Sequence, residues 1–313
     1  MRKNKAALFI LISLVSLSTQ AQVYAEMLLS DKKGDHKPIQ SLSVQGDVDV
    51  YNNLHHHGPA FESNLVGYRV YFDHRQTVDI YGKRRQGLEL AHTQFYPTEE
   101  DIENGYGDDV LWAGTTVSVG SFRGYINGKP TFIEPVNMRT ERILEYGPER
   151  TVVEIIDKGW EYDGQSIDMR QLYTLESGHR DVRVDVEMTS KSPIKNTFCT
   201  GVRLFSGGTE RRTATSVASW GTNWAYGPKD TTDIRRKATV GLAVCVPEQK
   251  AVHSIKNDGE NLLVILGAKR PRKKIHFTYY LAFCFDGEEW EGSYHSSEAW
   301  YSWVDKWQKN LMK

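Results

Sequence analysis

The densest group of reactive side chains lies between Leu54 and Leu90. It begins with three consecutive histidines, His55, His56 and His57. An imidazole suits proton transfer because it titrates close to neutrality, whereas zinc needs three or four ligands and no further ligand stands at a telling spacing. We therefore predict His56 or His57 as a general base or acid, and no metal site. The competing interpretation is that these histidines are polar residues satisfied by their neighbours.

Arg69 stands in an alternating stretch in which Tyr68 and Phe72 share one face. Its guanidinium would emerge from the opposite face, where a rigid fork of donors suits a carboxylate or a sulfate. An ordinary ion pair with Asp73 or Asp79 is the alternative. The pattern predicts Arg69 as an anion clamp, and it makes Tyr68 a proton carrier if the two faces are assigned the wrong way round.

The second half of the chain supplies further candidates. His276 and Tyr280 share one face of an expected strand, so His276 could contact substrate and Tyr280 could be the second proton carrier. Trp220 and Trp224 lie in a glycine-containing stretch that we expect to be a loop, where exposed rings suit the apolar face of a sugar. Ordinary packing and cross-strand pairing are the alternatives for all four residues.

Several chemistries lack support in the sequence. Asp108 and Asp109 form an acidic pair without the spacing of a calcium-binding hand, so a solvated loop is favoured there. The chain has no phosphate-binding loop, no dinucleotide fingerprint, no GxSxG elbow and no HExxH motif. Nucleotide-dependent and serine-hydrolase functions are therefore disfavoured, and no cofactor is expected.

The sequence pattern predicts that the elements positioning these residues are mainly β-strands. Short alternating or apolar runs are separated by turn signals, and Asn127-Gly128 and Asp163-Gly164 are typical of tight hairpins. The absence of a repeat or a linker favours one large antiparallel β-sandwich. The expected strands are 67–73, 77–81, 110–119, 151–156, 168–175, 182–188, 200–205, 238–246, 261–267 and 274–285.

Helical patterns are scarce. A short helix is predicted over 97–104, with Thr98 as its cap and Asp101 in its first turn. A longer one is predicted over 296–311, where tryptophans recur at three- and four-residue intervals and are best read as a core-packing stripe.

Composition and the N-terminus bear on partners and compartment. The 39 Lys and Arg residues balance 40 Asp and Glu residues, so there is no global basic footprint for nucleic acid. A charged start, an apolar run and a small-residue zone predict a signal peptide over 1–25, cut after Ala21 or Ala25, followed by one domain over 26–313. The apolar run is too short for an anchor, so we expect a periplasmic or secreted protein.

Cysteine usage adds little chemistry. Cys199, Cys245 and Cys284 are an odd number, and two of them lie in apolar strand-like runs. Buried thiols are favoured over a disulfide, although an oxidising compartment would permit one.

Several separated motifs resemble one family. HHGPAFES, YRVYFD, DIYGK, LEL, FYPTEEDIENGYGDDVLWAG and SFRGY follow one another in order. They resemble the domain-of-unknown-function 4861 family of glycan-degrading bacteria, and the resemblance covers nearly the whole mature chain. It implies a fold similar to the galactose-mutarotase-like β-supersandwich and an association with dehydration of oligosaccharides, notably from ulvan. The residues it implies are His56, His57, Glu62, Tyr68, Arg69, Lys83, Glu89 and Asp109.

Taken with the candidate residues, the resemblance implies a carbon–oxygen lyase that removes water from an acidic oligosaccharide. Glu62, Lys83, Glu89 and Asp109 are expected to contact the substrate, while Trp220 and Trp224 would stack on a flanking sugar. The alternatives are a glycoside hydrolase or mutarotase, which could use Glu62 and Glu89, and a glycan-binding protein without catalysis.

Overall fold

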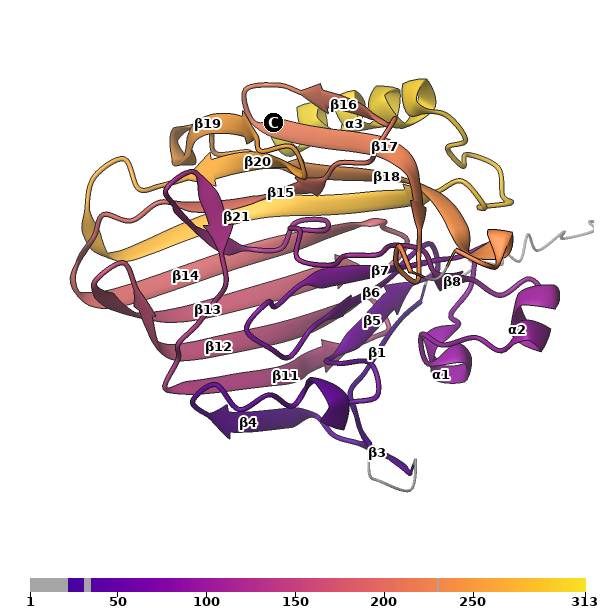
Figure 1. The fold of residues 1–313 in the computed structure, drawn as a ribbon, viewed down its shortest axis with the longest axis horizontal. Coiled ribbons are helices and arrows are strands. Elements are labelled where there is room, and N and C mark those ends of the chain that lie inside the picture. Colours follow the sequence, from indigo (N-terminus) through magenta and orange to yellow (C-terminus); the bar gives the residue numbers. More distant parts are fainter. Residues whose placement is uncertain (1–21, 31–34, 230) are drawn as a thin grey trace, which may run out of the picture.

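The computed structural model describes residues 22–30, 35–229 and 231–313, and strands dominate this part of the chain (Figure 1). One layer is a nine-stranded sheet in the order β16-β17-β18-β21-β14-β13-β12-β11-β4. Its strands are β16 (Thr209–Arg212), β17 (Ser216–Trp224), β18 (Lys237–Cys245), β21 (Arg272–Phe285), β14 (Asp181–Ile194), β13 (Gln165–Glu176), β12 (Arg150–Tyr162), β11 (Met138–Tyr146) and β4 (Ser41–Gln45).

Two five-stranded sheets form the other layer. The N-terminal sheet has the order β1-β5-β6-β7-β8, with β1 (Val23–Glu26), β5 (Ala60–Ser63), β6 (Gly67–Val70), β7 (Val78–Gly82) and β8 (Asp108–Asp109). The second has the order β10-β9-β15-β20-β19, with β10 (Lys129–Thr131), β9 (Arg123–Ile126), β15 (Phe198–Arg203), β20 (Asn261–Leu266) and β19 (Val252–Asn257). A small ribbon pairs β2 (Leu28–Ser30) with β3 (His36–Pro38).

One hydrophobic core fills the space between the layers. It joins Phe61 and Tyr68 of the N-terminal sheet, Phe198 of the second sheet, and Tyr173 and Phe277 of the nine-stranded sheet, all at most 2% exposed. The predicted faces of the stretch after Gly67 are therefore correct, because Tyr68 points into this core. The expected all-β antiparallel sandwich with a few short helices is confirmed.

Helices are few and peripheral. The longest, α3 (Ser297–Leu311), is capped by Ser296 and packs Trp300 and Trp307 on the outer face of the nine-stranded sheet, as predicted. The short helix predicted near residue 100 is α2 (Glu99–Glu103), with its capping box on Thr98. No described helix has the length and apolarity that a membrane span requires. The remaining ones are α1 (Leu90–Thr93), η1 (Tyr51–Asn53), η2 (Ile234–Arg236) and η3 (Gln249–Ala251).

The predicted hairpins and thiols are also confirmed. Asn127 and Asp163 have left-handed φ angles of 52° and 48°, and each is followed by a glycine of positive φ, as the tightest hairpin turns require. Cys199, Cys245 and Cys284 are buried free thiols.

Two local predictions are wrong. Residues 110–119 form no strand, because left-handed backbone at Gly114 and Ser118 interrupts the extended conformation. The valines of this loop are buried, whereas Trp112 is exposed. Trp220 and Trp224 lie in strand β17 rather than in a loop, paired with β18.

The expected leader falls mainly on residues 1–21, which lie outside the described residues. Strand β1 begins at Val23 and pairs along its length with β5. Cleavage after Ala25 would remove three of its four residues, including the buried Val23, whereas cleavage after Ala21 would leave the strand whole. We therefore expect the predicted signal peptide to be cleaved after Ala21 rather than after Ala25.

Candidate active site

The outer face of the N-terminal sheet carries a row of buried polar side chains. Glu62 of β5, Arg69 of β6 and Asp79 of β7 point away from the core, and each is at most 4% exposed. Leu90 of α1 and Phe95 from the turn after it pack over this face. Because buried charges need partners within the protein, the arrangement of these partners determines what each group can do.

Arg69 is held by two carboxylates and a phenol. Its Nε and Nη2 donate to Asp79 Oδ2 at 3.1 and 2.7 Å, and Nη2 also donates to Asp109 Oδ2 at 2.7 Å. Nη1 donates to the Tyr96 hydroxyl at 2.9 Å, and the guanidinium carbon lies 4.2 Å from the centre of the Phe95 ring. Protein groups therefore occupy Arg69, which is brought close to the histidines but is not open to a substrate as the predicted anion clamp.

One of the acidic partners of Arg69, Asp79, also holds Tyr71 in place through a hydrogen bond. Burial and the neighbouring Asp79 raise the pKa of Asp109, against the lowering effect of Arg69. Tyr71 donates to Asp79 at 2.5 Å, and burial raises the pKa of Tyr71 well above its usual range. The proton of Tyr71 is thus directed inward, and this residue is a fixed part of the network.

Tyr96 differs because it is 38% exposed. Its hydroxyl oxygen accepts the hydrogen bond from Arg69, so its own proton is free for another acceptor. Burial raises the pKa of Tyr96, while Arg69 opposes that rise. Gln94 and Phe95 before it have left-handed φ angles of 50° and 68°, a costly conformation that clusters at functional sites.

His57 has a defined tautomer. Its Nδ1 lies 2.9 Å from the carbonyl oxygen of Tyr51, which can only accept, so Nδ1 carries the proton and Nε2 keeps its lone pair. Burial lowers the pKa of His57 to about 4, so the imidazole is neutral at ordinary pH. His57 also has a left-handed φ of 62°. A neutral imidazole with a free Nε2 lone pair can accept a proton, although its lowered pKa makes it a weaker base than an ordinary histidine.

Rings surround this imidazole. Tyr51 stacks on His57 at 3.6 Å with an interplanar angle of 1°. The centroids of Tyr71 and Tyr96 lie 5.9 and 6.3 Å from that of His57, and His55 lies 5.3 Å from Tyr96. We call Tyr51, His55, His57, Tyr71 and Tyr96 the imidazole–phenol cluster, with Arg69 behind it.

The other two histidines have different surroundings. His55 packs against His36 at 3.7 Å between centroids, and burial lowers its pKa to about 4. His56 is fully buried, and its Nε2 bonds Glu26 Oε1 at 2.8 Å. Burial lowers the pKa of His56 as well. Of the predicted pair, His57 is half-buried, whereas His56 is fully buried and ties the histidine turn to β1.

Glu62, Lys83 and Glu89 form a separate buried knot. Lys83 pairs with Glu62 and donates to the carbonyl oxygens of Ser63 and Gly87 at 2.6 and 2.5 Å. Glu62 accepts the backbone N–H of Glu89, and the Glu89 carboxylate accepts the N–H of Gly107. Burial raises the pKa of both glutamates. These groups hold the loop before α1 and are not arranged to contact substrate.

Three other predicted residues lie away from the cluster. Tyr68 is fully buried and donates to the carbonyl oxygen of Arg180. Tyr280 packs against the group of residues beneath α3, on the outer face of the nine-stranded sheet. His276 is exposed on the same face, 3.2 Å from Asp185. The structure does not bring these residues to Arg69.

The two tryptophans of β17 are also separated in role. Trp220 packs beneath α3, whereas Trp224 lines a cavity of about 500 Å³ together with Trp112. Arg203 lines the same cavity, and its Nη1 is buried without a hydrogen-bond partner among the described residues. Trp112 stands three residues after Asp109, so this cavity adjoins the segment that supports Arg69.

Sequence reasoning missed Tyr51, Tyr71 and Tyr96. Tyr71 could have been found, because it shares the alternating face of Arg69. Tyr51 begins η1 and Tyr96 lies in the loop after α1, and only the fold determines how these segments approach each other. As regards metals, no group of three or more His, Cys, Asp or Glu among the described residues could hold an ion.

Comparison with known proteins gives a family and distant structural likenesses. A family model described as domain of unknown function (DUF4861) matches residues 4–313. No curated protein sequence matches the chain.

Three solved structures are similar at very low identity. A TPR-domain containing protein from Parabacteroides distasonis shares 10% identity and a TM-score of 0.39, over 84% of this chain and 55% of that one. A putative kojibiose phosphorylase from the human microbiome shares 9% sequence identity with a TM-score of 0.48, over 93% of this chain and 37% of that one. A heparan sulfate lyase HepC mutant from Pedobacter heparinus shares 10% sequence identity with a TM-score of 0.40, over 70% of this chain and 33% of that one. The chain spans between a third and about half of their length, and with every TM-score below 0.5 none of them bears on the chemistry of the cluster.

Proposed function

The chain belongs to the DUF4861 family, and we propose that it is an exported carbohydrate-active enzyme, a carbon–oxygen lyase that dehydrates an acidic oligosaccharide at the imidazole–phenol cluster. The observation that carries the proposal is the tautomer of His57. Its Nδ1–H is committed to the Tyr51 carbonyl, which leaves a neutral Nε2 lone pair, and the centre of this ring lies 6.3 Å from that of Tyr96, whose phenol proton is free. A base and an acid on neighbouring rings are what elimination of water requires.

The step balances with these two groups. His57 Nε2 takes the proton from the carbon next to the sugar carboxylate, the carbon–carbon double bond forms, and the neighbouring carbon–oxygen bond breaks. Tyr96 gives its proton to the departing hydroxyl, which leaves as water. The phenolate of Tyr96 is stabilised by the hydrogen bond from Arg69 until the proton returns from His57 through solvent. Arg69 is therefore a positioning and charge-stabilising residue.

Negative charge that develops on the substrate also needs a cation. Arg75 is 25% exposed in its side chain, and its guanidinium lies 4.8 Å from the centre of the Tyr51 ring and 5.1 Å from that of Tyr71. Its Nε donates to Asp73, which fixes its direction. Arg75 rather than Arg69 is thus the cation that a substrate carboxylate can approach.

The cavity beside Trp112 and Trp224 supports an acidic sugar as the substrate. Aromatic rings accept the apolar face of a sugar, and the Arg203 guanidinium in the cavity wall, beside Glu260, is a cation that could attract a carboxylate. This cavity would hold a unit that flanks the reacting one.

A hydrolase that uses Glu62 and Glu89 is disfavoured by their partners. Both carboxylates are at most 5% exposed, and both accept backbone N–H groups. Hydrolysis needs carboxylates on either side of an open substrate site, which this buried knot does not offer.

The proposal is tested with a panel of uronate-containing and unsaturated oligosaccharides, analysed by mass spectrometry and ultraviolet absorbance. Dehydration yields a product lighter by one water with a new conjugated double bond. A product heavier by one water would instead establish a hydrolase, and binding without a mass change would establish a glycan-binding protein. His276→Gln, on the far face of the nine-stranded sheet, is the control variant that should retain full turnover.

A further inference from the structure

A basic groove lies at the connection between β20 and β21, on the opposite side of the molecule from α1 and α2 (Figure 1). Its cavity has a volume of about 580 Å³. None of the residues that line it belongs to the imidazole–phenol cluster or to the tryptophan cavity. The cations along it, which define the basic groove, are Lys250, Lys269, Arg270, Arg272 and Lys274.

The connection itself is unusually cationic. Residues 269–274 read KRPRKK, five cations in six positions, in a chain whose net charge is only −1. All of these residues are exposed. Clustered like charges repel one another, so this concentration opposes folding unless an anion offsets it.

No internal anion does so for most of them. Lys274 approaches Glu187 at 3.7 Å, but Lys250, Lys269, Arg270 and Arg272 have no carboxylate within ion-pair distance among the described residues. Glu248 is the one acidic residue in the lining. Arg142, Arg150 and Arg170 on strands β11, β12 and β13 are paired with glutamates. Single unpaired cations occur elsewhere on the described surface, so the groove is distinguished by having four of them close together.

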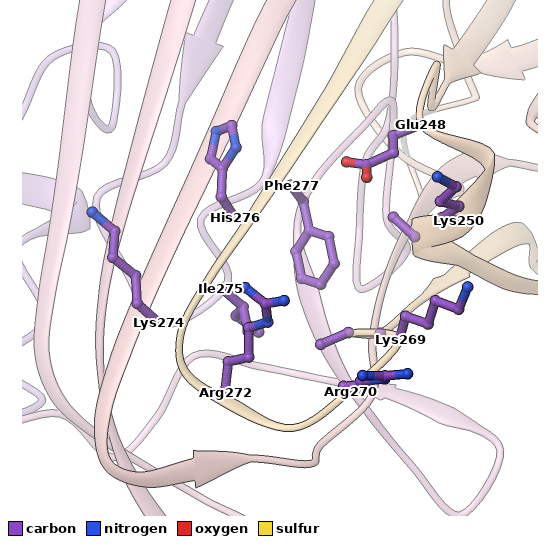
Figure 2. Close-up of a pocket in the computed structure, with 12 residues that line it drawn as sticks. Glu248, Lys250, Lys269, Arg270, Arg272, Lys274, Ile275, His276 and Phe277 are labelled. Atoms are coloured by element: carbon purple, nitrogen blue, oxygen red, sulfur yellow. The ribbon is translucent and has the colours of Figure 1, made fainter.

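The shape of the groove suits a chain more than a single ion. Lys250 of η3 lies across the cavity from Arg272 and Lys274 (Figure 2). Between them the floor is apolar, formed by Ile275 and Phe277 with small alanines beside them. Cations on both rims with an apolar floor match an anionic sugar chain, whose charged substituents would face the rims.

We propose that the basic groove docks a polyanionic polysaccharide, through sulfate or carboxylate groups spaced along the chain. Arginine and lysine together provide forked and point-charge donors for such oxyanions. Single-stranded nucleic acid fits less well, because no exposed Phe, Tyr or Trp lines the groove for base stacking, His276 is its one exposed ring, and Phe277 is only 2% exposed. An anionic membrane fits less well, because the KRPRKK turn has no apolar side chain to insert.

Such docking is independent of the proposed chemistry, because it would hold a polymer to the protein whatever the cluster does. It would concentrate long chains near the enzyme without contacting the reacting sugar. Its strength should fall steeply with ionic strength, because exposed charges are screened within about 10 Å at 0.1 M salt.

The test compares two triple variants of the full chain. The first neutralises the groove (Lys250→Gln, Arg270→Gln, Arg272→Gln), and the second removes the same charge elsewhere from exposed lysines (Lys129→Gln, Lys306→Gln, Lys309→Gln). Affinity is measured for dextran sulfate, polygalacturonate, uncharged dextran, duplex DNA and phosphatidylglycerol vesicles, at low and high salt.

We expect the groove variant to bind dextran sulfate or polygalacturonate about tenfold more weakly or worse, which corresponds to about 1.4 kcal/mol, and the control variant to bind as the parent does. Uncharged dextran should not bind at the groove. Equal weakening in both variants, a parent that binds neither polyanionic glycan, or tighter groove-dependent binding of DNA or vesicles would overturn the proposal. Because every substitution is at an exposed residue, both variants should fold, the groove variant should be at least as stable as the parent because charge repulsion is relieved, and turnover of short substrates should persist.

Discussion

The imidazole–phenol cluster and the basic groove treat charge in opposite ways. Arg69 is 4% exposed and has two carboxylates and a phenol as partners, whereas Arg270 and Arg272 are exposed without a carboxylate nearby. A buried cation with internal partners shapes the pKa values and proton positions of its neighbours. An exposed cation without internal partners is available to a ligand. The cluster is thus organised for chemistry, and the groove for attachment.

The sharpest test of this comparison is removal of one cation from each region. Arg69→Met should lower the free energy of unfolding by about 3–5 kcal/mol, because it leaves Asp79 and Asp109 close together without their cation. Arg272→Met should change it by no more than about 0.5 kcal/mol. Denaturant unfolding measures both. Equal stability losses would show that the two arginines do not differ in role.

The sequence predicted the sandwich, the hairpins and the two capped helices because local signals determine them. Thr98 with Asp101 forms a capping box, and Asn127-Gly128 permits a left-handed turn, whatever the rest of the fold does. The stretch 110–119 failed because its valines are buried by packing against other segments. An apolar run shows that a segment is buried but not in which conformation.

The site was predictable only in part for a related reason. Arg69 and Asp79 face each other across paired strands, so alternation places them together, as the ion-pair alternative anticipated. Tyr96 reaches Arg69 only because Gln94 and Phe95 adopt left-handed backbone, which no local pattern announces. The prediction that Tyr280 lies in the site was wrong, because the face of a strand on which a residue lies does not specify what packs against that face.

The second prediction concerns a substitution that should lower turnover without changing the free energy of unfolding. His57→Gln should reduce turnover by about 10²–10⁴-fold, the contribution of a positioned general base, while the unfolding curve changes little. In the parent enzyme, turnover should fall as pH drops through the His57 pKa of about 4, because protonation removes the Nε2 lone pair. Steady-state kinetics across pH, with His276→Gln as the matched exposed histidine, measures this. Parent-like turnover by His57→Gln would remove this residue from the mechanism.

The third prediction concerns stability at acidic pH. The histidines of the cluster should make the free energy of unfolding fall as pH drops, whereas the cations of the groove should not. His55 and His57 have folded-state pKa values of about 4, below the ordinary value of 6.5. Between these values the unfolded chain binds protons that the folded chain does not, so stability is complete above pH 6.5 and is lost as pH falls toward 4. Unfolding curves from pH 7 to 4 should show this slope in the parent and a shallower one in His55→Gln/His57→Gln. An identical slope in both would mean that other groups govern the acid response.

The smallest expected effect lies in the tryptophan cavity, where Trp224 should bind substrate through an aromatic contact rather than through charge. Trp224→Ala should raise KM by about two- to tenfold with kcat nearly unchanged, as expected for an aromatic contact worth about 0.5–1.5 kcal/mol. Trp220→Ala, on the same strand but packed beneath α3, should lower stability and leave KM unaltered. The KM change of Trp224→Ala should persist at high salt, whereas polyanion binding at the groove should not. A KM effect that vanished with added salt would assign Trp224 to charge-dependent attachment, and the cavity would then belong with the groove rather than with the cluster.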